Sequence, residues 1–280
     1  MIHIDAHQHF WRFDPVRDAW ITAEMSVLRR DVLPEELEGL LEANGVNGTV
    51  AVQADQSEAE TVFLLELAQA HPFILGVVGW VDLLAAELDQ RLEHFSRQVR
   101  FRGVRHIAQA EADDFLARPD VLRGIGALGK FGLTYDILVY PRQLPAALAL
   151  VRALPEQPFV IDHMAKPLVA QGVLEPWAAR MREMARHPNV CCKLSGLVTE
   201  ARWTGWAPED FRPYLDVVLE AFGPERLMFG SDWPVCRLAG EYGEVLALVE
   251  GYVGTLSSDE QAGIFGGNAA AFYGLKPADG

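Results

Sequence analysis

The sequence predicts an α/β fold, a single-domain (β/α)8 TIM barrel, from three observations. Eight short apolar runs recur along the 280 residues, helix-like stretches separate them, and no linker or repeat interrupts this alternation. Most of the runs are continuously apolar, which is typical of parallel strands that are covered on both faces. Eight strand–helix units in a chain of this length match the size of such a barrel.

The predicted elements follow this alternation in chain order. The strands are Ile2–Ala6, Thr49–Gln53, Ile74–Val81, Gly103–Ile107, Thr134–Val139, Phe159–Asp162, Val190–Leu194 and Leu227–Gly230. The helices are Pro34–Asn44, Ser57–Ala70, Leu84–Val99, Pro119–Lys130, Gln143–Leu154, Glu175–Arg186, Pro208–Phe222, Glu241–Val253, Ser258–Phe265 and Asn268–Phe272.

Two of these helices carry clear end signals. Helix 34–44 opens with Pro-Glu-Glu, a good first turn, and ends before Gly45, a residue that suits the position after a helix. Helix 57–70 opens with the capping box Ser57-Glu58-Ala59-Glu60 and stops at His71-Pro72. We expect one domain over residues 1–280, with the C-terminal helices at about 241–275 packing on the barrel.

A doubly wound open sheet is the alternative architecture. It would carry a glycine-rich phosphate-binding turn after its first strand. Here Ile2–Ala6 is followed by His7-Gln8-His9 instead, which disfavours a nucleotide-binding fold. In a barrel, functional side chains belong at the C-terminal ends of the strands, so a site is expected there.

Composition and charge argue against several classes of protein. The formal net charge of -15 and the pI of about 4.9 disfavour binding to nucleic acid. No run of 18 apolar residues predicts a membrane span, and the N-terminus lacks the pattern of a signal peptide. Three cysteines, an odd number, are typical of a reduced, cytoplasmic protein. A monomer and a homodimer fit the sequence equally.

Histidines and a carboxylate follow several of the predicted strands. His7 and His9 are two residues apart on an extended segment, so their side chains point to the same side. Asp232 follows the last predicted strand, and His163 follows the sixth. Imidazoles and a carboxylate that converge at one end of a barrel suit hydrolysis, with or without a metal ion.

Five segments spread over nearly the whole chain resemble the amidohydrolase superfamily. They are Ile4-Asp5-Ala6-His7-Gln8-His9-Phe10-Trp11, Gly103-Val104-Arg105-His106, Asp162-His163-Met164-Ala165-Lys166-Pro167, Cys192-Lys193-Leu194-Ser195-Gly196-Leu197 and Phe229-Gly230-Ser231-Asp232-Trp233-Pro234. The chain is most similar to the lactonase branch, which holds the 2-pyrone-4,6-dicarboxylate lactonases, the L-fucono-lactonases and related aldonolactonases. The resemblance implies a (β/α)8 barrel that opens the lactone of a sugar acid, such as L-fucono-1,5-lactone, L-rhamnono-lactone or D-arabinono-lactone, to the free aldonate.

One departure from the wider superfamily bears on metal content. Binuclear members carry a bridging carboxylated lysine after strand four and a further histidine after strand five, whereas this chain has Arg105-His106 and Tyr135-Asp136 there. We therefore expect no two-metal site. The remaining histidines and carboxylate suit one divalent ion, with Zn²⁺ the first choice. They equally suit a reaction that strictly requires no metal. The ligands for such an ion would be His7, His9 and Asp232, with His163 nearby.

For a lactonase, the resemblance suggests a role for each of these side chains. We expect Asp232 to take a proton from water and to return it to the leaving ring oxygen. The three histidines would polarise the lactone carbonyl as hydrogen-bond donors or through a metal. Other strand-end groups suit the hydroxyls of a sugar lactone, and these are Gln53, Arg105, His106, Asp136 and Trp233.

Some of these residues also have a structural interpretation. Arg105 and Asp136 would equally form an ion pair with each other. Lys193 lies within a predicted strand and needs a charged partner if it faces the barrel interior. Trp11, Trp80 and Trp203 are expected to line the mouth of the site and to stack on a sugar ring, with core packing as the default for Trp80.

Two other functions compete with that of a sugar lactonase. A metal-dependent decarboxylase of the same superfamily would share the histidines and the carboxylate but need a tightly bound metal ion. A ligand-binding barrel without turnover would bind a lactone and form no product. The full set of three histidines and Asp232 argues against the second alternative, because a protein that only binds needs no base beside a carbonyl group.

Overall fold

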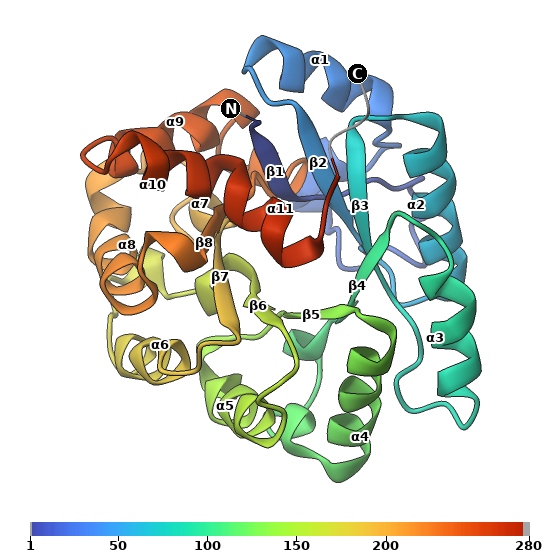
Figure 1. The fold of residues 1–280 in the computed structure, drawn as a ribbon. Coiled ribbons are helices and arrows are strands. Elements are labelled where there is room, and N and C mark those ends of the chain that lie inside the picture. Colours follow the sequence, from blue (N-terminus) through green and yellow to red (C-terminus); the bar gives the residue numbers. More distant parts are fainter. Residues whose placement is uncertain (1, 277–280) are drawn as a thin grey trace.

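Eight parallel strands form the centre of the molecule, and helices surround them (Figure 1). In this computed structural model, which describes residues 2–276, the strands are hydrogen-bonded in chain order. They are β1 (Ile4–Gln8), β2 (Gly48–Val52), β3 (Ile74–Gly79), β4 (Phe101–His106), β5 (Thr134–Ile137), β6 (Phe159–Ile161), β7 (Val190–Leu194) and β8 (Leu227–Phe229). The (β/α)8 barrel predicted from the sequence is confirmed.

The barrel closes where β1 meets the chain that follows β8. The amide of Asp232 donates to the carbonyl of His7 at 2.8 Å, and the amide of His9 donates to the carbonyl of Trp233 at 2.8 Å. These bonds belong to a parallel bridge between Gln8 and Trp233. Closure of the barrel therefore holds the segment that carries both N-terminal histidines directly against Asp232.

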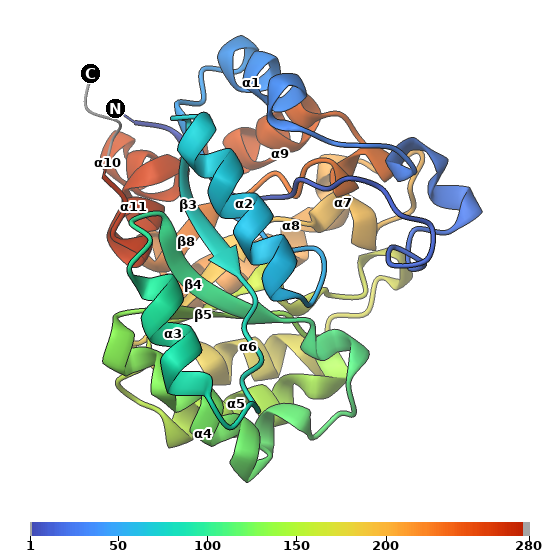
Figure 2. The same cartoon turned by 90° about the vertical axis from the view of Figure 1, so that its right-hand side faces the viewer.

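The helices lie outside the barrel and follow the predicted order (Figures 1 and 2). They are α1 (Pro34–Ala43), α2 (Glu58–Ala70), α3 (Leu88–Ser96), α4 (Pro119–Ala127), α5 (Leu144–Ala153), α6 (Trp177–Ala185), α7 (Leu197–Glu200), α8 (Pro208–Phe222), α9 (Tyr242–Val253), α10 (Ser258–Ala262) and α11 (Asn268–Tyr273). The sequence predicted all of these except α7, a single short turn after β7. The predicted capping box of α2 is present, since Ser57 Oγ accepts the amide of Glu60 at 3.2 Å.

Helix α11 and the residues just after it cover the barrel on the side away from the site. Tyr273 and Leu275 pack against an apolar cluster from β1, β2, β3, β6 and β8. The hydroxyl of Tyr273 donates to Asp136 Oδ2 at 2.7 Å. In Figure 1, α11 lies across this end of the barrel. The larger apolar core lies between the strands and the surrounding helices.

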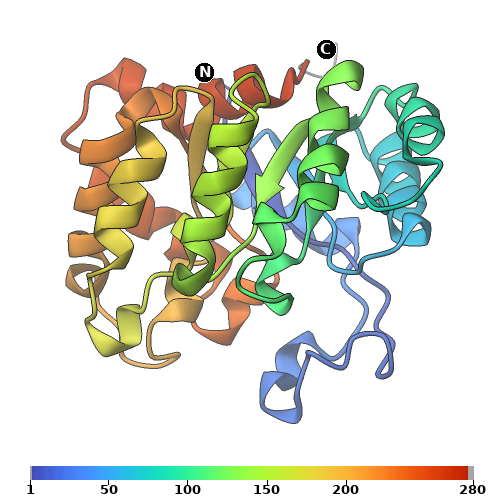
Figure 3. The same ribbon diagram turned by 90° about the horizontal axis from the view of Figure 1, so that it is seen from below.

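The segment between β1 and α1 leaves the body of the barrel and returns to it. Figures 2 and 3 show this segment, in blue, projecting on the side opposite the two termini. Trp11 and Val32 pair through both of their backbone groups at its base, at 3.0 and 2.9 Å. Trp11 Nε1 also donates to the carbonyl of Arg30 at 2.9 Å. In the part of the chain that the structure describes, no helix is long and apolar enough to cross a membrane.

Candidate active site

His7, His9, His163 and Asp232 converge at the C-terminal ends of the strands. Asp232 Oδ1 lies 3.3 Å from His9 Nε2 and 3.8 Å from both His7 Nε2 and His163 Nε2. His7 Nε2 and His9 Nε2 are 3.2 Å apart. All four residues are buried. Residues that stand more than 200 positions apart in the sequence thus form one cluster.

An unusual backbone conformation holds part of this cluster. Five of the described residues have a positive φ without being glycine, and all five lie at the site. They are His163, Met164, Ala165, Lys166 and Asp232. A left-handed conformation costs such residues about 1–2 kcal/mol each, and strain of this kind concentrates at functional sites. The run of four, one residue after β6, forms a left-handed turn whose first and last side chains, His163 and Lys166, both line one cavity.

Two glycines leave space for the histidines. A Cβ on Gly230 would lie 2.7 Å from His7 Cβ, and a Cβ on Gly196 would lie 2.5 Å from His163 Nδ1. Both distances are shorter than ordinary van der Waals contacts, which are about 3.5–4.0 Å between carbon atoms. The present positions of the His163 ring and of the His7 backbone and Cβ therefore require glycine at residues 196 and 230.

Each histidine ring is oriented through its Nδ1 atom. His9 Nδ1 donates to the carbonyl of Val52 at 2.7 Å, which fixes the ring so that Nε2 lies 3.3 Å from Asp232 Oδ1. His163 Nδ1 lies 2.9 Å from Ser195 Oγ.

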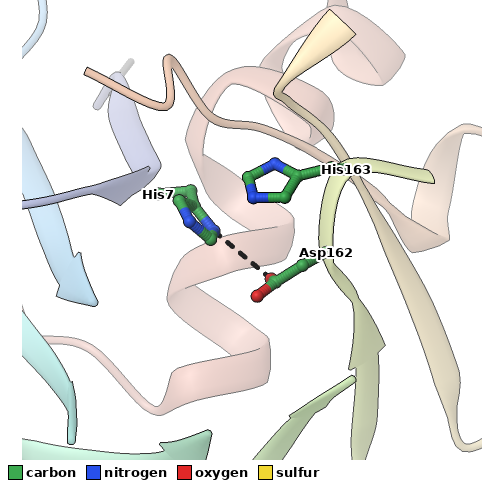
Figure 4. A group of neighbouring side chains, drawn as sticks. All are labelled: His7, Asp162 and His163. Carbon is green, nitrogen blue, oxygen red and sulfur yellow. Dashed lines mark ion pairs between the residues drawn. The ribbon is translucent and has the colours of Figure 1, made fainter. Parts of the chain in front are cut away.

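His7 Nδ1 has two charged neighbours. Lys193 Nζ lies 3.2 Å away and Asp162 Oδ1 lies 3.3 Å away. Figure 4 shows Asp162 and His163, consecutive residues after β6, on the same side of the His7 ring, with a dashed line for the ion pair between His7 and Asp162.

Buried charges form a network beneath His7. Lys193 Nζ lies 2.6 Å from Asp136 Oδ2 and 3.0 Å from Asp162 Oδ1, and Arg105 lies 3.1 Å from Asp162 Oδ2. The expected ion pair between Arg105 and Asp136 is wrong, although the two residues are neighbours in the register of β4 and β5. Lys193 reaches Asp136 from β7, and Asp162 accepts the guanidinium instead.

Burial and neighbouring charges set the ionisation of these groups. Burial raises the pKa of Asp232, but His163, His9 and Lys166 lower it more, so the carboxylate stays charged with a pKa below its ordinary value. Burial lowers the pKa of His7 and of His163 well below their usual values, so both rings are neutral near pH 7. The site therefore combines one anionic carboxylate with neutral imidazoles.

A cavity of about 320 Å³ opens above the cluster. Its polar lining consists of His9, Gln56, Arg105, Gln109, His163, Lys166 and Asp232. Its apolar lining consists of Trp11, Trp20, Ala54, Ile107, Ala110, Leu138 and Val235. A cavity with a few convergent polar groups beside apolar and aromatic walls is typical of a site for a small molecule.

The predicted substrate contacts lie at different depths. Arg105 lines the cavity. Gln53, Asp136 and Trp233 are fully buried and are not part of the cavity wall. The side-chain Nε2 of Gln53 donates to the carbonyl of Arg105 at 3.1 Å. His106 is nearby but turned toward protein partners, since its ring nitrogens lie 3.3 Å from Trp80 Nε1 and 3.0 Å from Glu111 Oε1.

Other lining residues were not found by sequence reasoning. Gln56 and Gln109 lie in the loops after β2 and β4, where no motif distinguishes them. Lys166 belongs to the motif after β6, and its reach into the cavity depends on the left-handed turn. Of the expected aromatic residues, Trp11 lines the cavity, whereas Trp20 from the projecting segment is present in place of Trp203.

The donor atoms of the cluster fit one divalent cation. Nε2 of His7, Nε2 of His9 and Oδ1 of Asp232 are 3.2 to 3.8 Å from one another. Ligand atoms at about 2.1 Å from a tetrahedral zinc ion would be about 3.4 Å apart. The bond from His9 Nδ1 to a carbonyl is of the kind that orients metal-binding histidines.

The barrel brings together histidines from the ends of β1 and β6 and an aspartate that follows β8. This is the architecture of an amidohydrolase-type enzyme. The chain belongs to the amidohydrolase family, whose profile matches residues 4–275. An L-fucono-1,5-lactonase from Burkholderia multivorans is 45% identical over 291 residues, which cover 99% of this chain and 98% of that protein. The resemblance inferred from the sequence motifs is confirmed.

Solved structures agree with this assignment. The crystal structure of an amidohydrolase from Burkholderia multivorans with bound zinc has a TM-score of 0.95 and 45% sequence identity, covering 99% of this chain and 100% of that chain. A probable 2-pyrone-4,6-dicarboxylic acid hydrolase from Acinetobacter baumannii has a TM-score of 0.81 at 18% identity, covering 98% of this chain and 100% of that chain. At that identity the second likeness concerns the fold alone.

Proposed function

We propose that this protein hydrolyses the lactone ring of a sugar acid to the free aldonate, with L-fucono-1,5-lactone or a related aldonolactone as its substrate. The observation that carries the proposal is the ionised carboxylate of Asp232 at the base of a cavity, surrounded by His7, His9 and His163. The relative that is 45% identical over nearly its whole length is an L-fucono-1,5-lactonase, which supports the substrate class.

The two kinds of cavity wall suit a sugar lactone. Trp11 and Trp20 offer aromatic surfaces, and their ring centroids lie 6.0 Å apart in an edge-to-face arrangement. Gln56, Gln109 and Lys166 offer donors and acceptors for hydroxyl groups. Among the residues first expected to contact the sugar, we keep Arg105 and assign Gln53, Asp136 and Trp233 to the support of the site, because these three are buried behind it.

Asp232 is the general base of the proposed reaction. Its carboxylate accepts a proton from water as the water oxygen bonds to the lactone carbonyl carbon. When the bond between that carbon and the ring oxygen breaks, Asp232 returns the proton to the ring oxygen, which leaves as a hydroxyl group. A carboxylate with a low pKa is a weak base, but it suffices here because a lactone is more reactive than an amide.

Neutral histidines polarise the carbonyl oxygen in this scheme. His7 and His163 each direct Nε2 toward the centre of the cluster and are candidates for donors to the developing oxyanion. His9 Nε2 lies 3.3 Å from Asp232 Oδ1, and its Nδ1 donates to the carbonyl of Val52. We assign His9 to the same polar cluster, beside the carboxylate of Asp232.

The proposed reaction can include one divalent cation but does not require it. His7, His9 and Asp232 would hold it, and the zinc in the crystal structure of the Burkholderia multivorans amidohydrolase supports zinc as the ion. A bound cation would polarise the carbonyl group or lower the pKa of water. The cytoplasmic location and the choice between a monomer and a homodimer stay predictions from the sequence.

A panel of lactones tests the proposed function. Proton release at weakly buffered neutral pH would be followed for L-fucono-, L-rhamnono-, D-arabinono- and D-glucono-lactone and for a pyrone dicarboxylate, each with and without chelator. We expect selective turnover of a sugar lactone. Carbon dioxide release from an aromatic acid, with no lactone turnover, would contradict the proposal and favour the decarboxylase. Binding of a lactone by calorimetry without product would favour a binding protein.

A further inference from the structure

The short backbone segment that carries Asp232 is hydrogen-bonded at each of its amides. The amide of Asp232 donates to the carbonyl of His7 at 2.8 Å. The amide of Ser231, one residue earlier, donates to Asp5 Oδ1 at 2.9 Å. The amide of Trp233, one residue later, donates to Ser231 Oγ at 3.0 Å. Two of these three bonds therefore depend on side chains rather than on a backbone ladder between strands.

Asp5, in β1, is the acceptor on which these bonds converge. Its Oδ1 also accepts the amide of His7 at 3.1 Å. Its Oδ2 accepts the hydroxyl of Ser231 at 2.6 Å and the hydroxyl of Tyr242, from α9, at 3.2 Å. A carboxylate has about four accepting sites and no donor, so all four bonds fit it, whereas an asparagine would present donors to part of this set.

These bonds act on backbone that is under strain. Asp232 has a φ of +57°, in the left-handed region that is unfavourable for residues other than glycine. Asp5 is fully buried, so water does not compete for its oxygens. A hydrogen bond to a charged group contributes at least as much free energy as one residue in the left-handed region costs. Without the bonds to Asp5, the segment can relax and turn the Asp232 carboxylate away from the histidines.

We propose that Asp5, acting through Ser231, is a positioning residue that holds the carboxylate of Asp232 against the histidine cluster. Asp5 does not line the cavity, so it does not act on the substrate directly. The catalytic part of this inference rests on the proposed function, in which Asp232 is the general base, whereas the effect on the position of Asp232 does not.

Closure of the barrel is the alternative role of the same bonds. They join β1 to the chain that follows β8, so they stabilise the fold whether or not Asp232 is a base. A purely structural role predicts variants of lower stability whose folded molecules keep the kcat of the wild type. A positioning role predicts a lower kcat at a nearly unchanged KM, because the substrate contacts in the cavity stay in place.

Two variants at the same carboxylate oxygen separate these roles. Ser231→Ala removes one hydroxyl donor from Asp5 Oδ2 and also removes the acceptor of the Trp233 amide. Tyr242→Phe removes one hydroxyl donor from the same oxygen but leaves the bonds of the segment 231–233 intact. Asp5→Asn, which replaces one acceptor oxygen with a donor group, is the third variant. Thermal melting verifies that each variant is folded.

We expect Ser231→Ala to lower kcat for lactone hydrolysis by about 100-fold at a nearly unchanged KM, since a displacement of about 1 Å in a catalytic group costs about that much. Asp5→Asn should lose at least as much. Tyr242→Phe should melt at a lower temperature and keep the kcat of the wild type. Equal kcat values for Ser231→Ala and Tyr242→Phe would overturn the inference, as would wild-type kcat in folded Asp5→Asn.

Crystal structures of the same variants without substrate give a reading that needs no activity. In Ser231→Ala, Asp232 Oδ1 should move by about 1 Å from its present place 3.3 Å from His9 Nε2. In Tyr242→Phe it should stay there. An unmoved Asp232 in Ser231→Ala and in Asp5→Asn would overturn the inference. Absence of lactone turnover in the wild type, together with the expected displacement, would contradict the proposed function and leave the positioning of Asp232 by Asp5 standing.

Discussion

Gly196 controls the position of His163, and its replacement by alanine is a sharp perturbation of the site. Gly196 follows β7 with a φ of +60°, and a Cβ there would lie 2.5 Å from Nδ1 and 2.7 Å from Cγ of His163. Ordinary contacts between such atoms are about 3.5 Å, so the imidazole has to move by about 1 Å. Gly196→Ala therefore displaces one of the proposed oxyanion donors without removing it.

The expected loss is larger for activity than for stability. An alanine in the left-handed conformation destabilises a protein by about 1–2 kcal/mol. A displacement of about 1 Å in a catalytic group reduces turnover by about 100-fold. We therefore expect kcat/KM of Gly196→Ala to fall by about two orders of magnitude, while denaturant unfolding shows a well-folded protein.

Gly132→Ala is the matched control for this variant. Gly132 has a φ of +65°, and a Cβ there would meet no atom within 4 Å. The control thus introduces the same backbone strain without the contact to His163, and it should lose a similar free energy of unfolding while it retains full activity. Equal activity in the two variants, measured as lactone hydrolysis, would refute the steric argument.

Three further predictions concern ionisable side chains. Because burial holds the pKa of His7 and of His163 well below 6.5, log kcat/KM should be flat from about pH 6 to pH 8, and a break near pH 6.5 would contradict the neutral state of these rings. Lys166→Met should raise KM by about 10-fold through loss of a charged donor, and an unchanged KM for every sugar lactone would remove Lys166 from the substrate contacts. Burial raises the pKa of Glu60 from 4.5 to about 7, so the folded state holds a proton that the unfolded state lacks, and stability falls by about 3 kcal/mol as the pH rises through this window. Glu60→Gln should abolish that fall, and parallel stability curves for the two proteins would show the pKa assignment to be wrong.

The strands and most helices could be predicted because their signals are local. A continuous apolar run marks each buried strand, and the Ser57 capping box and the prolines at helix starts mark helix ends. Short elements such as α7 (Leu197–Glu200) were missed, because four residues are too few to show a helical period. The predicted helix 84–99 is shorter in the structure, where α3 covers Leu88–Ser96.

Only those residues of the candidate site that directly follow a strand could be predicted. His7, His9, His163 and Asp232 follow strands, and a barrel brings such residues to one end. The partners of the buried charges could not be predicted, because they depend on how far Lys193 reaches across the barrel interior.

The left-handed turn after β6 also had no sequence signal. Residues 163–166 contain no glycine, and left-handed backbone is unfavourable for every one of them. Only the surrounding structure imposes this conformation, and with it the reach of Lys166 into the cavity. Gln56 and Gln109 lie in loops, whose paths depend on tertiary packing that a single sequence does not display.

The most direct test of the account compares Asp232→Asn with the wild type in the hydrolysis of L-fucono-1,5-lactone. Asparagine has the same shape and tolerates the φ of +57° that Asp232 adopts, so the variant keeps its backbone and loses only the base. We predict a loss of kcat by about 10²- to 10⁴-fold with an unchanged melting temperature. Near-normal turnover by the folded variant would contradict the assignment of Asp232 as the general base.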